Sequence, residues 1–508
     1  MDVKMKKFMK RAGEWLSGRS GMALYATLLL IAVLVTLNSV VYALTSKYQL
    51  YLYSPEKTVV PMSDVSELYF KRAMTGGRRV SVIFCDDEED VREHDLGKLV
   101  YETATRLKEM HPDFIELRFV NSVTGYEAAT EQYVDLKPYT EDGTVRIRPT
   151  SIIFECEGNF RVMTGGSTGY EDFFSLTSSG EVYAYNGEEV LASMICWVTE
   201  SEHKTVYFTQ NHGETADIAL NSAFVSAGYY VDTINLRKQN VPDDAALVVI
   251  SNPINDFEKS ADVSGATAEL DRLEKYLSRG GNLYVALDPL VKKLNHLEEY
   301  LSKWGFELYE GEDENGNIAR DIVRDSTTGD TADGYRFILT PVENGYSTPI
   351  FGLMNEYVDT SVRISQTGRL KLSGGAVALM RSSDTSVAAR SGEIIDNEGS
   401  YDVIGFNRIT NEDGSEATVM VVPSVFLTST ENMVNNTYTN KAFVLATLAT
   451  HFGAKQAPIG CQSLIYRGAI LEGLTMGRAR AYTAIMLAIP AAIAVAGTVI
   501  IIKRKNRL

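Results

Sequence analysis

The sequence lacks the short motifs by which most cofactor and metal sites are identified. It contains no G-x-x-x-x-G-K-[ST] segment, so the chain does not hydrolyse ATP through a P-loop. Its six histidines are scattered and form no H-x-x-x-H pair, so zinc is not indicated. We therefore expect no cofactor and no bound metal.

Cysteine is also scarce. Cys85, Cys156, Cys196 and Cys461 form no C-x-x-C pair and have no metal-ligand spacing. Cys85 and Cys196 lie in apolar runs, so we interpret them as small buried residues, with a role in disulfides as the alternative.

Positive charge is concentrated at the two ends of the chain. The first 20 residues carry six basic and two acidic side chains, and the last six carry four basic ones, while the 508 residues together have a formal net charge of -17. The middle is therefore strongly acidic, and its field repels nucleic acid phosphates. This excludes a nucleic-acid partner, and the length predicts two or three core-bearing units.

Charge is absent from two long apolar stretches, 22–46 and 481–502. At about 1.5 Å per residue, either stretch is long enough as a helix to cross a hydrocarbon core of ~30 Å. Pro490 interrupts the second stretch, which a membrane helix tolerates. The sequence thus predicts a transmembrane helix at 22–46 and another at 481–502.

The basic tails 1–21 and 503–508 are expected in the cytoplasm, because Lys and Arg next to a span resist translocation. This predicts a two-pass plasma-membrane protein with residues 47–480 outside, although Arg478 and Arg480 weigh slightly against it. The alternative for the first stretch is a cleaved signal peptide, since 41–43 (VYA) resembles a cleavage site. The apolar run exceeds the usual ~7–15 residues of such signals, so we favour an uncleaved anchor.

Residues 201–305 show the clearest α/β pattern. Helices expected at 216–227, 266–278 and 291–304 alternate with strands expected at 205–208, 229–236, 246–250 and 282–287. Such alternation predicts a doubly wound α/β domain with a parallel sheet. The final strand and helix of this domain are assigned to 401–460, after a β-rich insertion at 306–400. A membrane-proximal α/β and β-rich domain is assigned to 47–200, and a linker to 461–480.

The loop Asn211-His212-Gly213-Glu214 is the most distinctive candidate site. It follows a predicted strand and precedes a predicted helix, where open α/β sheets bind ligands. His212 can titrate and helix-start amides attract anions. The alternative is structural, with Gly213 forming a tight turn and Glu214 opposing the helix dipole. We predict a ligand- or partner-binding loop and no catalytic residue.

Three other segments match motifs only superficially. The segment 165–169 (GGSTG) fits G-x-S-x-G, but that motif requires a buried strand before it and a long helix after it. The acidic runs 85–90 (CDDEED) and 311–317 (GEDENGN) could bind calcium through oxygen atoms, yet neither has EF-hand spacing. We interpret them as solvated turns.

The chain resembles the GldG family of gliding-motility-associated ABC transporter auxiliary components. The segments that carry the resemblance are 185–214, 246–253, 276–289 and 421–453, together with the closing apolar stretch with Pro490 and Gly497. Family members often have G-H-G-E where this chain has Asn211 to Glu214, which casts doubt on an anion-binding role for the first position. No family motif is placed in 306–400.

The resemblance implies a bacterial, non-enzymatic accessory subunit with a glutamine-amidotransferase-like α/β layer that lacks its catalytic cysteine. Its expected partners are the membrane, an ABC permease and a separate ATPase subunit. Two alternatives stay open: an anchored hydrolase acting on envelope glycan or peptide, and a binding or sensor protein that works alone. The resemblance does not imply a transported substrate.

Overall fold

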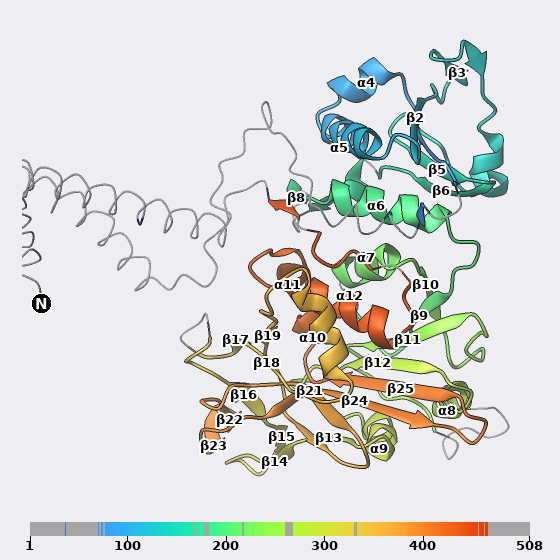
Figure 1. Ribbon diagram of the computed structural model, residues 1–508. Helices are drawn as coiled ribbons and strands as arrows, with labels where there is room; N and C mark the ends of the chain where they lie inside the picture. Colours follow the sequence, from blue (N-terminus) through green and yellow to red (C-terminus); the bar gives the residue numbers. More distant parts are fainter. Residues whose placement is uncertain are drawn as a thin grey trace, which may run out of the picture. The chain divides into compact units, whose positions relative to one another are not determined.

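The computed structural model describes residues 36, 70, 73–74, 77–166, 169–176, 182–215, 218–259, 268–329, 333–455, 457–461 and 463–465. All of these except residue 36 belong to one of two compact units, which consists of 59–466 and 472–508. The elements below all lie in this unit (Figure 1).

A four-stranded sheet forms the first half of the unit. β1 (Val80–Phe84) pairs parallel with β2 (Ile115–Phe119) and antiparallel with β5 (Ile152–Cys156), and β6 (Asn159–Met163) follows β5 in a hairpin. The order across the sheet is β2-β1-β5-β6. α4 (Glu88–Glu93) and α5 (Gly97–Met110) connect β1 to β2, so this part contains one β-α-β crossover.

Both faces of this sheet are covered because its strands alternate apolar side chains between them. Val80, Val82 and Phe84 pack with apolar residues of α5 and of α6 (Gly187–Val198). Ile83 and Ile153 point to the other face, where residues between 134 and 147 cover them. Every residue of α6 is buried, so this helix is an internal element of the fold.

The smaller elements of this half are short. They are β3 (Tyr126–Glu127), β4 (Gln132–Tyr133), η2 (Lys137–Gly143), η3 (Glu171–Phe173), β7 (Phe174–Leu176) and β8 (Val182–Tyr185). β8 also pairs with β26 (Leu464–Ile465), which brings residues near the end of the described chain next to this half.

An eight-stranded sheet forms the second half, in the order β10-β9-β11-β12-β25-β24-β21-β18. The first five strands are parallel: β10 (Tyr230–Ile234), β9 (Thr205–Thr209), β11 (Ala245–Ser251), β12 (Asn282–Ala286) and β25 (Glu416–Val422). The other three continue it in antiparallel pairs: β24 (Asp402–Thr410), β21 (Val377–Arg381) and β18 (Thr340–Pro341). The predicted mixed α/β fold with a parallel sheet is therefore confirmed.

Helices cover both faces of the parallel sheet (Figure 1). α7 (Ile218–Ser226), α10 (Ser347–Asn355) and α12 (Asn440–His451) contribute to the core on one face, beside η4 (Phe426–Thr428) and α11 (Thr430–Val434). α8 (Glu269–Leu277) and α9 (Asn295–Lys303) contribute to the core on the other face. Because helices cover both faces of the sheet, both faces of β11 are buried, and its sequence is an almost continuous apolar run.

Short antiparallel strands occupy much of 306–400. They are β13 (Phe306–Leu308), β14 (Glu310–Glu312), β15 (Ile318–Arg320), β16 (Ile322–Arg324), β17 (Arg336–Ile338), β19 (Arg363–Ser365), β20 (Leu370–Leu372), β22 (Val387–Arg390) and β23 (Glu393–Asp396). Arg369 and Arg390 both reach the buried carboxylate of Asp321, which ties these hairpins together.

Within the part of the chain that the structure describes, no helix is long and apolar enough to cross a bilayer. The description of the chain as a transmembrane protein thus has no support among the described residues. The predicted spans 22–46 and 481–502 fall, except for Thr36, outside the described residues, as do both basic tails and most of the linker 461–480.

Candidate functional site

The topology of the parallel sheet singles out one pair of loops. Numbered along the chain, the five parallel strands lie in the order 2-1-3-4-5, so the winding direction reverses between β9 and β11. In open α/β sheets of this order, ligands bind outside the carboxyl ends of the strands at this reversal point. The loop 210–215 follows β9 and the loop 252–257 follows β11, so these two loops form the candidate site.

His212 joins the two loops from inside the protein. Its side chain is fully buried, and its Nδ1 lies 2.8 Å from Glu214 Oε1. Its Nε2 lies 3.0 Å from Oε2 of Glu269, the first residue of α8. The imidazole also stacks on the ring of Phe257, with 3.7 Å between the ring centroids. Both ring nitrogens are therefore engaged by carboxylates.

The electrostatics favour a charged imidazole between two charged carboxylates. Burial alone would lower the pKa of His212, but the hydrogen bonds and charges of Glu214 and Glu269 outweigh it and raise the pKa to about 9. Burial likewise opposes the charge on Glu214 and Glu269, yet the bond to His212 leaves the pKa of each below its ordinary value. Arg237 adds a further cation, with its Nε 3.4 Å from Glu269 Oε1.

Backbone hydrogen bonds fix the same two loops. The carbonyl oxygen of His212 accepts from the amides of Ile254 at 2.8 Å and Asn255 at 2.9 Å. Asn211 has φ 89° and Gly213 has φ 76°, both in the left-handed region. A Cβ at Gly213 would lie 2.3 Å from Cγ1 of Ile254, so only glycine fits there without movement. We call the contacts of His212, Glu214, Phe257 and Glu269 the His212 lock.

The four predicted site residues differ in their burial. His212 is buried and the side chain of Glu214 is only 8% exposed, whereas Asn211 and Gly213 are exposed. The alternative interpretation of Gly213 as a turn residue fits this geometry, while Glu214 bonds to His212. The binding role of Asn211, His212, Gly213 and Glu214 stays a prediction.

Sequence reasoning missed the apolar residues at this edge. Ile218 begins α7, Ile254 follows β11 and Leu290 follows β12, and these side chains are 82%, 54% and 65% exposed. Since β9, β11 and β12 are neighbours in the sheet, their carboxyl ends lie side by side. We call these three residues the carboxyl-edge patch. In the sequence, the signal for these exposed residues was the presence of isoleucine and leucine in segments that connect a strand to a helix.

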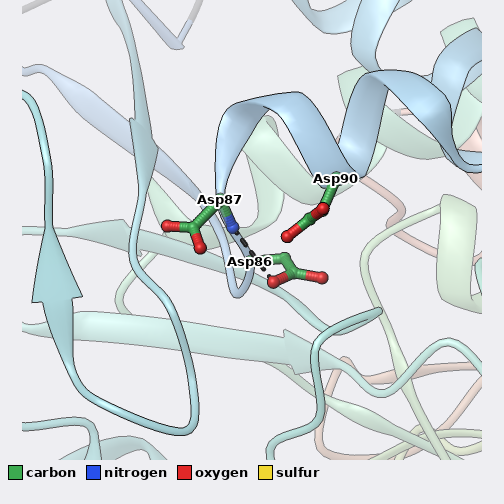
Figure 2. Close-up of side chains that lie close together, drawn as sticks. All are labelled: Asp86, Asp87 and Asp90. Carbon is green, nitrogen blue, oxygen red and sulfur yellow. Dashed lines mark hydrogen bonds between the residues drawn. The ribbon is translucent and has the colours of Figure 1, made fainter.

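Three carboxylates form a second cluster after β1 (Figure 2). Oxygen atoms of Asp86, Asp87 and Asp90 lie within 4.8 Å of one another, which is the donor type that hard divalent cations prefer. Burial, then the charges of Asp90 and Asp87, raise the pKa of Asp86, although a bond from the Asp87 amide opposes this. Asp87 also accepts a hydrogen bond from Asn121 at 2.8 Å. These residues could hold a cation, but nothing further in their surroundings points to one.

The other acidic run is organised as a turn. Oδ1 of Asp313 accepts the amides of Asn315 at 2.9 Å and Asn317 at 2.8 Å. Its carboxylate is thus engaged in the backbone of the β14–β15 hairpin, as an aspartate in a loop often is.

The G-x-S-x-G segment does not have the surroundings of a nucleophile elbow. The edge strand β6 precedes it, and the three-residue helix η3 follows in place of a long helix. Gly165, Gly166 and Gly169 all have positive φ, which is typical of a glycine turn. Ser167 itself lies outside the described residues.

The predicted burial of two cysteines is confirmed. Cys85 and Cys196 are both 0% exposed, and neither forms a disulfide. Cys85 follows the first strand of a β-α-β unit, a position where redox motifs occur in some proteins. Burial and then the charge of Asp86 raise the pKa of its thiol to about 12, so it is almost entirely protonated and unreactive.

Comparisons with known proteins give no family. No family model matches the chain and no curated protein matches it. Among solved structures, the mmIFT52 N-terminal domain shares 12% identity at a TM-score of 0.35, covering 49% of this chain and 97% of that one. PurLQS from Thermotoga maritima shares 12% at 0.29, covering 49% and 99%. A glutamine amidotransferase from the same organism shares 13% at 0.24, covering 54% and 95%. These TM-scores are too low to support an inference.

These findings correct one description drawn from the sequence. The resemblance described a transmembrane component of GldG type, yet no family model supports that name and no described helix can span a bilayer. What the described residues do form is a mixed α/β body with a doubly covered parallel sheet.

Proposed function

We propose that this chain is a non-catalytic binding subunit that works in an assembly with other proteins, and that this assembly is an ABC-type transport system. The α/β body would recognise its partner through the carboxyl edge of the parallel sheet. A permease and a separate ATPase subunit are the partners to test first, because this sequence has no P-loop of its own.

The observation that carries the proposal is the His212 lock. Enzymes built on such sheets place nucleophiles and acid–base groups at the carboxyl ends of the strands. Here the one titratable ring in that position has both nitrogens bound to carboxylates and is fully buried. A general base must reach the proton that it abstracts, and His212 cannot reach a ligand while the lock is closed.

The surface above the lock suits recognition. Asn211, Asn255 and Thr215 are exposed there and carry no charge. The carboxyl-edge patch adds three exposed apolar side chains in the segments that follow the same strands. Exposed apolar residues with polar residues beside them are characteristic of protein contact sites.

The proposal keeps the expectation of a glutamine-amidotransferase-like layer without its nucleophile. The loops that follow β9, β11 and β12 contain no cysteine, as their sequences at 210–217, 252–268 and 287–294 show. An extracytoplasmic location of the body remains part of the prediction from the sequence.

The decisive experiment is affinity purification of the tagged full-length chain from its own cells. We expect a permease and an ATPase to co-purify with the native chain. Ile254→Arg should reduce their recovery at least tenfold, because a charge would enter the carboxyl-edge patch.

Ile394→Arg is the matched control. Ile394 lies in β23, a strand outside the main sheet, and is 57% exposed, close to the 54% of Ile254. Equal loss in both variants would indicate a general effect of the charge and would contradict the proposed surface. A native chain that purifies with no companion protein would overturn the accessory role and favour a sensor that works alone.

A further inference from the structure

A large cleft lies between α8 and α9, on the face of the main sheet that these two helices cover. Its volume is about 570 Å³, within the range of small-molecule sites. α8 contributes residues from Leu270 to Ser278 to one wall, a length of about 12 Å at the helical rise. The cleft is therefore long enough for an extended ligand.

The floor of the cleft is apolar and partly aromatic. Leu270 and Leu277 of α8, Tyr300 of α9 and Trp304, which directly follows α9, line it, and each is less than 10% exposed. Covering this apolar surface with the aliphatic carbons of a ligand would remove it from water, which is favourable for binding. Aromatic rings also attract cations placed over their faces.

The rim of the cleft carries more acceptors than cations. Asp271 and Glu274 stand on α8, and Glu299 stands on α9. Lys259 forms an ion pair with Glu299 at 3.1 Å, so its charge is already matched. Lys303 is the other ammonium group among the described lining residues. Glu274 accepts one hydrogen bond, from the Tyr300 hydroxyl at 2.8 Å, and a carboxylate has room for several more.

We propose that this cleft binds a linear aliphatic polyamine. Asp271 and Glu274 are three residues apart on one helix, so their side chains start roughly 5–6 Å from each other. Three or four methylenes between two ammonium groups span a similar length. The methylenes would lie along the apolar floor, and the ammonium groups would reach the carboxylates.

The charge of the cleft argues against the other ligand classes. The cleft is lined by the three carboxylates of Asp271, Glu274 and Glu299 and by the two ammonium groups of Lys259 and Lys303, so a phosphate or carboxylate ligand would add to an excess of negative charge. A purely apolar ligand would leave these carboxylates without a function in binding. The net charge of -17 would also raise the local concentration of a cationic ligand.

The test is isothermal titration of the full-length chain with spermidine, at moderate salt to suppress non-specific attraction. We expect saturable binding at one site. Glu274→Gln should weaken it at least tenfold, since the amide keeps the shape and still accepts the Tyr300 hydrogen bond but loses the charge.

Glu393→Gln is the matched control, because Glu393 is an exposed carboxylate on β23, outside the cleft. It should leave the affinity unchanged. Equal weakening by both substitutions would show general attraction to an acidic protein and would overturn the proposal, as would the absence of saturable heat. Thermal melts of both variants establish that each one folds, so a loss in Glu274→Gln alone supports the site.

Discussion

Replacing His212 by phenylalanine tests the His212 lock directly. Phenylalanine keeps a ring to stack on Phe257, but it removes the cation between Glu214 and Glu269. Breaking a buried ion pair by removing one partner costs about 3–5 kcal/mol, because the remaining charge is left uncompensated. We therefore expect His212→Phe to lower the free energy of unfolding by this amount at pH 6.5.

The raised pKa of His212 gives a second value for the free energy that the charged ring contributes to folding. The pKa of His212 rises from 6.5 to about 9, which corresponds to about 3 kcal/mol of stabilisation. Because the folded-state pKa lies above the ordinary one, this stabilisation is complete below about pH 6.5 and is lost as the pH rises through about 9. The lowered pKa values of Glu214 and Glu269 act in the opposite direction. Their stabilisation is present above about 4.5 and is lost on acidification.

The assay is urea denaturation of the native chain and of His212→Phe between pH 6 and pH 10. The difference in unfolding free energy between the two should shrink steadily as the pH rises from 6.5 to beyond 9. His451→Ala is the control, since His451 is half-buried and donates to the Tyr346 carbonyl at 2.8 Å without a carboxylate partner. Its removal should cost about 1 kcal/mol. Identical pH profiles for the native chain and His212→Phe would refute the reasoning.

Three further outcomes follow from the backbone conformation, the ion pairs and the burial of single residues. Gly213→Ala should lower the free energy of unfolding by about 1–3 kcal/mol in thermal melts, because its φ is 76° and the new Cβ would collide with Ile254. Gly228→Ala should lower it less, because Gly228 has a similar φ of 91° but open space around it. Lys441→Met should cost about 3–5 kcal/mol in urea denaturation, because Lys441 pairs with Glu189, whose side chain is 4% exposed. Cys85 should resist maleimide labelling until the chain unfolds, whereas the half-buried Cys461 should react first; the reverse order would contradict its burial.

Local pattern was enough to predict the parallel half of the main sheet. The apolar run expected at 246–250 is the core of β11, and the strand expected at 229–236 contains β10. The helix expected from 291 begins only at Asn295, as α9. The residues before it form a turn in which the Asp288 side chain accepts a hydrogen bond from the Leu290 amide at 2.9 Å. Such a bond between a side chain and the backbone competes with helix formation, and the periodicity of apolar residues does not reveal it.

Long-range pairing could not be predicted in the same way. β24 pairs with β25 in a local hairpin, but β18 pairs with β21 across α10, β19 and β20, and β21 pairs with β24 across β22 and β23. Glu269 illustrates the same limit within the site. An acidic residue in the first turn of a helix is ordinarily explained by the helix dipole, yet this one lies 3.0 Å from a ring nitrogen of His212, 57 residues earlier. Only the folded sheet brings the two together.

The His212 lock and the α8–α9 cleft share a helix, which leads to a last prediction. Glu269 begins α8 and contacts His212, and Glu274 lies on the cleft side of the same helix. Phe257, which stacks on His212, accepts a hydrogen bond from His296 Nδ1 at 2.8 Å, and His296 also lines the cleft. A ligand that holds α8 and α9 in place should therefore stabilise the lock, since opening the lock would displace groups that the ligand fixes.

Amide hydrogen exchange measures this coupling. Saturating spermidine should slow exchange at 211–215 and 254–257 severalfold in the native chain. In His212→Phe the same ligand should leave exchange at 211–215 nearly unchanged, because the ring that connects the loop to Glu269 no longer bonds to it. If exchange in the native chain slows only in α8 and α9 and not at 211–215, then a ligand in the cleft does not stabilise the His212 lock, and the predicted coupling is wrong.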